Sequence, residues 1–377
     1  MRNFTFKGLF LAAMFMVLGS LAIQAADDDG LITKQIIVKL EKAGTLPDRI
    51  GSTKRNKITN LKIIGEINGT DLCVIREMAG RNYYDSESDG KLAILDLSET
   101  KIVSGGGRYL YDDHFSNYFY THDNELGSRA FCNCSGLTSL SLPSGITSIG
   151  REAFSGCSGL TSLTLPSSLT SIEDYAFYGC SGLTSLSFPS GITSIGSEAF
   201  SGCSGLTSLT LPSSLTSIED NAFYGCSGLT SLSLPSDITT IGWSAFSGCS
   251  GLTSLSLPSG LTSIDDCAFS GCSGLTSIYV YAEKLPNMGS GVFDGCDVKK
   301  CTVYVPKGTY DDYWLSEFGY FENIVEFEAT GINNVITSND AKELSRYSVN
   351  GQRLSAPTKG LNIVKYSDGS VKKVAVQ

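Results

Sequence analysis

The chain has 377 residues, a formal net charge of −10 at pH 7 and twelve cysteines. An acidic chain without a basic stripe argues against nucleic acid or an anionic membrane surface as partner. The length exceeds that of one ordinary domain, but a repeat protein can be this long without a single central core.

The first 26 residues have the pattern of a secretory signal peptide. Arg2 and Lys7 precede an apolar run over residues 8–23, and the small residues Ala25 and Ala26 follow it. The run is shorter than a membrane-spanning helix requires, and the combination is typical of a cleaved leader. We expect residues 1–26 to be removed on export and the mature protein to be secreted or held at the cell surface, with no membrane span.

Residues 27–129 are predicted to form an irregular N-terminal cap with degenerate repeats. Residues 31–42 are expected to form a short helix, and a second helix is expected over residues 71–78, capped by Thr70 or Asp71. Irregular repeats of this kind shield the first regular coil of an array from solvent. Two apolar triplets in the cap have the spacing L-x-x-L-x-L: Ile58, Leu61 and Ile63, then Leu92, Leu95 and Leu97.

A Tyr- and Asp-rich loop over residues 105–123 holds the two histidines of the chain, His114 and His122. Acidic residues nearby would allow a metal site or an acid–base pair. No regular ligand spacing is present, so a solvated insertion in the cap is the favoured interpretation. We expect neither a metal nor a cofactor.

From residue 130 to residue 303 one short phrase recurs with a period of 23 residues. A fixed period in the twenties is the signature of a stacked solenoid. A frayed eighth copy stands at Val292-Phe293. The regular copies of the Ala-Phe pair are Ala130-Phe131, Ala153-Phe154, Ala176-Phe177, Ala199-Phe200, Ala222-Phe223, Ala245-Phe246 and Ala268-Phe269.

The unit over residues 160–182 shows what each position does. Alternation along a short strand directs Leu163 and Leu165 to one face and Ser162 and Thr164 to the other. The glycine of the Ser-Gly pair that ends the unit is expected to take a positive φ in a tight turn. The remaining positions predicted to face inward are Leu169, Ile172, Ala176, Phe177 and Cys180.

These phrases resemble the BspA-like leucine-rich repeat family of secreted and surface proteins. The residues that carry the resemblance are I-T-S-I-G at 146–150 and A-F-x-G-C-S-G-L-T-S-L at 153–163, both recurring in register. The resemblance implies a β-rich solenoid of the α/β repeat class, with right-handed coils and a C-terminal cap over residues 130–328. It also implies a binding or adhesive protein without naming the partner.

Two larger units are near copies of each other. Residues 153–198 and 199–244 differ at six of 46 positions, one of them Ser197 against Trp243. A surface this uniform is suited to repeated weak contacts, in which avidity replaces a single deep pocket.

Most cysteines recur at the repeat period. Parallel side chains on stacked coils cannot readily meet, so we expect buried thiols that behave as small hydrophobic groups rather than disulfides. Cys301 is also predicted to be buried, whereas Cys73, Cys132 and Cys267 could pair or be free. The periodic cysteines are Cys134, Cys157, Cys180, Cys203, Cys226, Cys249 and Cys272, with Cys296 close to the period.

Beyond the array, Val298, Cys301 and Val303 are predicted to form a last strand. Residues 306–327 are expected to close the solenoid with a helix around 310–317 and a strand over 324–327.

Residues 329–343 are predicted to be a polar linker before a small β module over residues 344–377. The module is expected to contain two hairpins. It resembles the C-terminal sorting domains of the type IX secretion system through Tyr347-x-x-x-Gly351-x-x-Leu354 and Gly360-Leu361-x-Ile363-Val364. A stabilising terminal cap is the alternative.

Two sets of residues are candidates for ligand binding. The first is the hydroxyl columns on the outer face of the strands, represented by Ser162, Thr164, Ser208 and Thr210; a plain soluble surface is the alternative. The second is an aromatic group at the C-terminal end, which either binds a ligand or packs under the cap. That group consists of Tyr279, Tyr281, Lys300 and Tyr304.

Other aromatic residues, Tyr178, Tyr224 and Trp243, form either a second patch or scattered exposed side chains.

The predicted leader and the repeat array favour an exported binding or adhesion protein that engages extracellular protein or glycan. The alternative is a structural spacer or surface-layer component without a soluble ligand. An enzyme is not expected, because the sequence contains neither a nucleophile elbow nor a metal motif.

Overall fold

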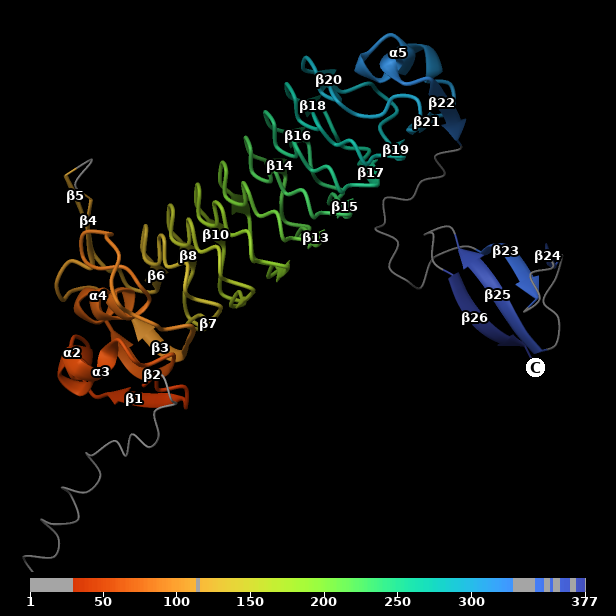
Figure 1. Cartoon of the computed structure of the whole chain (residues 1–377). Helices are drawn as coiled ribbons and strands as arrows, with labels where there is room; N and C mark the ends of the chain where they lie inside the picture. Colours follow the sequence, from red (N-terminus) through yellow and green to blue (C-terminus); the bar gives the residue numbers. More distant parts are fainter. Residues whose placement is uncertain are drawn as a thin grey trace, which may run out of the picture. The chain divides into compact units, whose positions relative to one another are not determined.

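The computed structural model describes residues 30–112 and 116–327, together with the backbone of four strands between residues 343 and 376. The chain divides into two compact units, residues 1–326 and 327–377 (Figure 1). The predicted signal peptide and almost all of the predicted linker lie outside the described residues. In the parts that are described, no helix is long and apolar enough to cross a bilayer.

The solenoid begins with a strand where the sequence predicted a helix. Strand β1 (Ile36–Leu40) pairs in parallel with β2 (Asn60–Ile67), with Ile36 opposite Leu61. The prediction of a helix over residues 31–42 was therefore wrong. Three consecutive β-branched residues at the start of β1 favour a pleated strand, and pairing with β2 buries every second side chain against the core.

The two predicted apolar triplets of the cap lie at two neighbouring strands of one sheet. Strand β2 pairs in parallel with β3 (Ile94–Ile102), and β3 pairs with the first strand of the array. All six apolar residues of the two predicted triplets are buried. Further elements of the cap are α2 (Leu46–Arg49), α3 (Ser52–Arg55), α4 (Gly69–Met78), β4 (Leu110–Asp112), β5 (Asn117–Phe119) and β6 (Glu125–Leu126).

Helix α4 confirms the predicted second helix, but its cap is Asn68 rather than Thr70 or Asp71. The Asn68 side chain accepts a hydrogen bond from the backbone N–H of Thr70 at 3.0 Å. The Asp71 carboxylate accepts one from the backbone N–H of Asn68, also at 3.0 Å. This reciprocal capping box satisfies two N–H groups at the helix start.

Each regular coil contributes two short parallel strands, which form two rows along the array. The first-row strands carry the predicted leucine pattern. They are β7 (Ser139–Ser141), β9 (Ser162–Thr164), β11 (Ser185–Ser187), β13 (Ser208–Thr210), β15 (Ser231–Ser233), β17 (Ser254–Leu257), β19 (Ser277–Val280) and β21 (Thr302–Pro306). These strands belong to two sheets, one ending at β9 and the other beginning at β11. Within each sheet, residues pair with their equivalents one repeat away, for example Leu209 with Leu232.

The second row was not predicted as strand. It consists of β8 (Ser148–Ile149), β10 (Ser171–Ile172), β12 (Ser194–Ile195), β14 (Ser217–Ile218), β16 (Thr240–Ile241), β18 (Ser263–Ile264) and β20 (Asn287–Met288). Figure 1 shows β14, β16, β18 and β20 along one side of the array and β13, β15, β17 and β19 along the other. The two rows give the array two separate outer faces.

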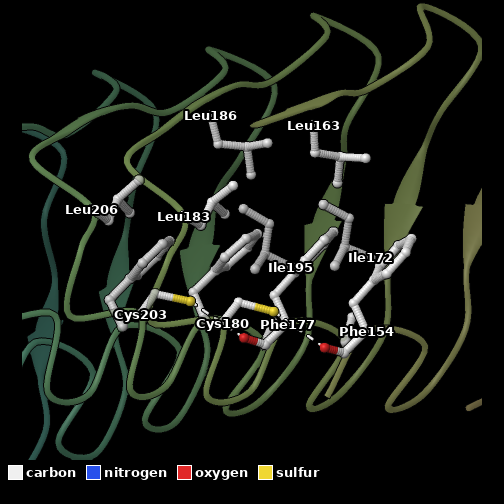
Figure 2. Close-up of a cluster of buried hydrophobic side chains, with 14 of the residues drawn as sticks. Phe154, Leu163, Ile172, Phe177, Cys180, Leu183, Leu186, Ile195, Cys203 and Leu206 are labelled. Carbon is white, nitrogen blue, oxygen red and sulfur yellow. Dashed lines mark hydrogen bonds between the residues drawn. The ribbon is translucent and has the colours of Figure 1, made fainter. Parts of the chain in front are cut away.

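The repeated phenylalanines stack inside the coils. From Phe131 to Phe293, neighbouring ring centroids lie 5.0–5.8 Å apart and the rings are within 15° of parallel. All of these rings are buried. Figure 2 shows Phe154 and Phe177 in this arrangement, with leucine and isoleucine side chains above them. The prediction of inward phenylalanines is confirmed.

The periodic cysteines lie beside this stack as free thiols, and the three cysteines whose pairing was open are free as well. Cys134 and the six other regular members are buried. The thiols are also hydrogen-bond donors, which had not been predicted. The Cys180 thiol donates to the carbonyl of Phe154 at 3.1 Å, and the Cys203 thiol donates to that of Phe177 at 3.2 Å (Figure 2).

Two glycines of each coil have different roles, and the sequence-based prediction assigned them wrongly. Gly179, in the Phe-x-Gly-Cys phrase, has a φ of +69°, whereas Gly182 of the Ser-Gly pair does not have a positive φ. Gly182 is required for another reason. A Cβ at this position would overlap the backbone carbonyl oxygen of Ser158 in the preceding coil.

Each regular coil also holds one non-glycine residue in the left-handed region. These residues have φ values of 51–58° and sit just before the Ala-Phe pair. They are Arg129, Glu152, Tyr175, Glu198, Asn221, Ser244 and Cys267.

The C-terminal cap follows β21. It contains α5 (Tyr310–Trp314), the short 3₁₀ helix η1 (Glu317–Tyr320) and β22 (Asn323–Phe327). The predicted helix over 310–317 is shorter than expected, because the Ser316 hydroxyl accepts from the N–H of Phe318 and begins a new turn. Phe318 packs on Phe293 with ring centroids 5.1 Å apart and covers the end of the stack.

The second unit is a four-stranded antiparallel sheet. Its strands are β23 (Glu343–Ser348), β24 (Arg353–Leu354), β25 (Gly360–Tyr366) and β26 (Val371–Val376), in the order β24-β23-β25-β26. The pairs β23–β24 and β25–β26 correspond to the two predicted hairpins.

Candidate binding surfaces

The first-row face presents hydroxyl groups in regular columns. In β9 and β13 the side chains of Ser162, Thr164, Ser208 and Thr210 are exposed, while the leucine between each pair is buried. Parallel pairing in register places the β13 hydroxyls beside their equivalents in β11 and β15, and those of β9 beside their equivalents in β7. The predicted orientation of these four residues is confirmed.

The hydroxyls of each coil fall into two groups with different partners. One threonine per coil, just before the first-row strand, donates to the backbone carbonyl of the equivalent threonine one repeat earlier. These bonds measure 3.0–3.5 Å and involve Thr161, Thr184, Thr207, Thr230, Thr253 and Thr276. Such threonines stabilise the stacking of coils, and their hydroxyl donors are already used.

The hydroxyls on the outer face of the first-row strands, unlike these threonines, have almost no hydrogen-bond partners within the protein. The hydroxyls of Thr164, Ser208 and Thr210 make no hydrogen bond to any residue described by the structure, and that of Ser162 makes one long contact of 3.5 Å with the Ser139 hydroxyl. Each hydroxyl can donate one bond and accept two. The face therefore offers unused donors and acceptors at regular spacing.

At the C-terminal end of this face the columns become aromatic. Tyr279 of β19 pairs with Tyr304 of β21, and their rings stack with centroids 4.5 Å apart and planes within 7°. Burial, and next the neighbouring Tyr304 hydroxyl, raise the pKa of Tyr279. Burial also raises the pKa of Tyr281. All three tyrosines are half-buried, so each keeps part of its ring available.

Lys300, the fourth residue of this predicted group, interacts with an acidic residue rather than with the tyrosines. Lys300 forms an ion pair with Asp297 at 2.7 Å, and its side chain is 78% exposed. This pair raises the pKa of Lys300 and lowers that of Asp297. The structure thus brings Tyr279 and Tyr304 together and places Lys300 in the turn before β21.

The loop that contains the histidines has an aromatic surface of its own. The Arg108 guanidinium lies 3.6 Å from the centroid of the Tyr118 ring and donates to the Tyr120 hydroxyl at 2.8 Å. His122 is exposed, and His114 lies outside the described residues. Within the described ranges no group of three potential metal ligands is found.

The remaining aromatic candidates, Tyr178, Tyr224 and Trp243, are 44%, 48% and 51% exposed. Trp243 lies beside a hollow of about 380 Å³ on the second-row side. This hollow was not predicted from the sequence. The available signal was the replacement of Ser197 by Trp243 between two otherwise similar copies.

Short parallel strands with the L-x-x-L-x-L pattern, stacked at a period of 23 residues, define a leucine-rich repeat solenoid. A family model described as BspA type leucine rich repeat region matches six copies over residues 124–250 and 194–313. The chain belongs to this family.

Several solved structures are similar to the chain. A T. pallidum leucine rich repeat protein is 32% identical, with 45% of this chain and 68% of that chain covered and a TM-score of 0.33. A leucine rich cell surface protein from Faecalibacterium prausnitzii A2-165 is 23% identical, with 70% and 82% covered and a TM-score of 0.38. The pneumococcal vaccine antigen PcpA is 16% identical, with 81% and 82% covered and a TM-score of 0.38. No curated protein matches the chain.

Proposed function

We propose that the chain is an exported binding protein of the cell surface or the extracellular medium, and that its first-row face engages extracellular protein or glycan. The observation that carries this proposal is the set of outward hydroxyls without a protein partner, which ends in the stacked pair Tyr279 and Tyr304. Membership of the BspA-type family and the apolar run over residues 8–23 support export.

The geometry favours many weak contacts over one deep pocket. Equivalent hydroxyls repeat once per coil, so a repetitive partner can meet the same group several times along the array. Tyrosine adds an amphipathic ring, and this residue type is enriched among those that dominate binding energy at protein interfaces. The tyrosine pair is therefore the expected anchor of the contact.

We predict that Tyr279→Ala combined with Tyr304→Ala weakens binding by roughly tenfold or more, because a central tyrosine typically contributes over 1 kcal/mol. The measurement is surface-immobilised binding to a panel of extracellular matrix proteins and glycans, with the wild-type full chain as reference. Tyr178→Ala is the matched control, since this exposed tyrosine lies outside the pair. Equal loss in the control would reject the tyrosine pair as the anchor.

A panel without any binding, together with self-association of the protein, would instead support a structural spacer.

We also propose that the β module over residues 344–377 directs sorting, on the basis of its sequence motifs. Cell fractionation with mass spectrometry of the mature termini tests both export and the fate of this module.

A further inference from the structure

The hollow beside Trp243 is built from three consecutive coils on the second-row side, away from the first-row strands that carry the tyrosine pair. It has a volume of about 380 Å³ and opens broadly to solvent, so it can hold a single small ring. The turn after β16, strand β18 with the turn after it, and strand β20 supply the lining. The residues that matter most for its chemistry are Trp243, Asp265, Asp266, Asn287 and Met288.

Trp243 is held by its backbone but not by its ring. Its N–H donates to the Asp220 carboxylate at 2.8 Å, and its carbonyl accepts from the N–H of Asn221 at 2.8 Å. The indole makes no ring contact or hydrogen bond with any residue in the described part of the chain. Because Ser197 fills the same position one duplication earlier, the indole is not needed for stacking of the coils.

The polar groups of the hollow are oriented by the protein and keep unused capacity. One oxygen of Asp265 accepts from the Ser263 hydroxyl at 2.8 Å, and one oxygen of Asp266 accepts from the N–H of Ser290 at 2.7 Å. The second oxygen of each carboxylate is left for a ligand. The side-chain amide of Asn287 has no hydrogen-bond partner among the described residues and offers both a donor and an acceptor.

This combination matches the chemistry of a sugar ring. A pyranose has an apolar C–H face that can lie on an indole, and hydroxyls that both donate and accept hydrogen bonds. We propose that the hollow beside Trp243 binds a neutral hexopyranose unit, with the indole as platform and Asp265, Asp266 and Asn287 as hydroxyl partners. This site is separate from the tyrosine pair and stands or falls independently of it.

The charge of the lining narrows the class of sugar. Two carboxylates and no basic residue line the hollow, so an anionic sugar would be repelled. The protonated amine of an amino sugar would be attracted to the two carboxylates, and added salt would weaken its binding. The affinity for a neutral sugar would be nearly independent of salt concentration.

The test is saturation-transfer NMR on the full chain with four probes: D-glucose, N-acetyl-D-glucosamine, D-glucuronate and ethanolamine. We expect saturable binding of at least one neutral sugar, little change with added salt, and no binding of glucuronate. Trp243→Ala should weaken sugar binding at least about fivefold, as expected for loss of a stacking platform. Asn287→Ala should also weaken it while leaving the platform in place.

Tyr224→Ala is the matched control, because this exposed aromatic residue lies one coil earlier and does not line the hollow. Its sugar affinity should equal that of the wild type. Three results would each overturn the proposal: no binding of either neutral sugar, binding that survives Trp243→Ala, or salt-sensitive binding of ethanolamine without any binding of neutral sugar.

Discussion

Raising the pH above about 9 should unfold the solenoid within roughly one to two pH units, because every regular coil buries a thiol that must ionise once the chain unfolds. Burial raises the pKa of Cys134 and of Cys180 from 9.0 to about 12. Burial likewise places the pKa of Cys203 and of Cys226 well above 9.0. In the folded array these thiols therefore stay protonated at pH values where free thiols are ionised.

The direction follows from the protons bound in each state. Below about pH 9 both states hold the thiol proton, and the stabilisation is fully present. Between 9.0 and the folded pKa of about 12 for Cys180, the unfolded chain releases a proton that the folded chain keeps. Each such thiol lowers the free energy of unfolding by about 1.4 kcal/mol per pH unit. The seven regular thiols together reach roughly 10 kcal/mol per pH unit, comparable with the whole stability of a typical domain.

Denaturant unfolding at a series of pH values, followed by circular dichroism with a reductant present, checks this expectation. Cys203→Ala removes one buried thiol and its bond to the Phe177 carbonyl. This substitution should lower the free energy of unfolding by about 1 kcal/mol at neutral pH. Above pH 9 it should make the fall of that free energy with pH less steep, by about 1.4 kcal/mol per pH unit. A slope that is shallow in the wild type, or unchanged in this variant, would contradict buried protonated thiols.

Phe200→Ala should cost about 4 kcal/mol of stability, the usual range for truncating a fully buried phenylalanine. The Phe200 ring stacks between Phe177 and Phe223 at centroid distances of 5.0 and 5.4 Å, and Phe188 meets it edge-on at 5.5 Å. Its removal opens a cavity in the middle of a continuous stack, which the neighbouring coils cannot close without losing their strand register. The midpoint of denaturant unfolding at neutral pH measures the effect.

Tyr224→Ala is the control for this prediction, since it removes an aromatic ring that is 48% exposed from the adjacent coil. It should change the free energy of unfolding by no more than about 0.5 kcal/mol. A loss below about 1 kcal/mol for Phe200→Ala would show that the ring is not part of a close-packed core.

The repeat period made the inner surface predictable. Side chains such as Leu163, Phe177 and Cys180 occupy equivalent places in every copy, and only one side of a coil can be buried against its neighbours. The outward direction of Ser162 and Thr164 followed from the same alternation. These predictions did not depend on the detailed geometry of the turns.

The turns themselves could not be predicted in the same way. The left-handed position before each Ala-Phe pair holds residues as different as Glu152, Tyr175 and Cys267, so no residue type marks it. Gly182 is needed because of a backbone in the preceding coil, and such a contact has no local signal. The thiol hydrogen bonds, which span 26 residues, likewise leave no local signal in the sequence.

The candidate surfaces were predicted in part. The pairing of Tyr279 with Tyr304 followed from their equivalent strand positions, whereas the hollow beside Trp243 is lined by residues from three coils that the sequence pattern does not bring together. Lys300 was grouped with the tyrosines by its place in the sequence, but Asp297, three residues earlier, pairs with it instead.

In-register stacking of the coils, with aromatic rings and thiols inside and hydroxyls outside, is tested most directly by thiol labelling read out by mass spectrometry. In the native protein near neutral pH, an alkylating reagent should leave the seven regular cysteines from Cys134 to Cys272 unmodified. After denaturation without reductant, all twelve cysteines should be labelled, since each is a free thiol. Rapid native labelling of the regular cysteines, or disulfides between them in the denatured chain, would contradict this arrangement.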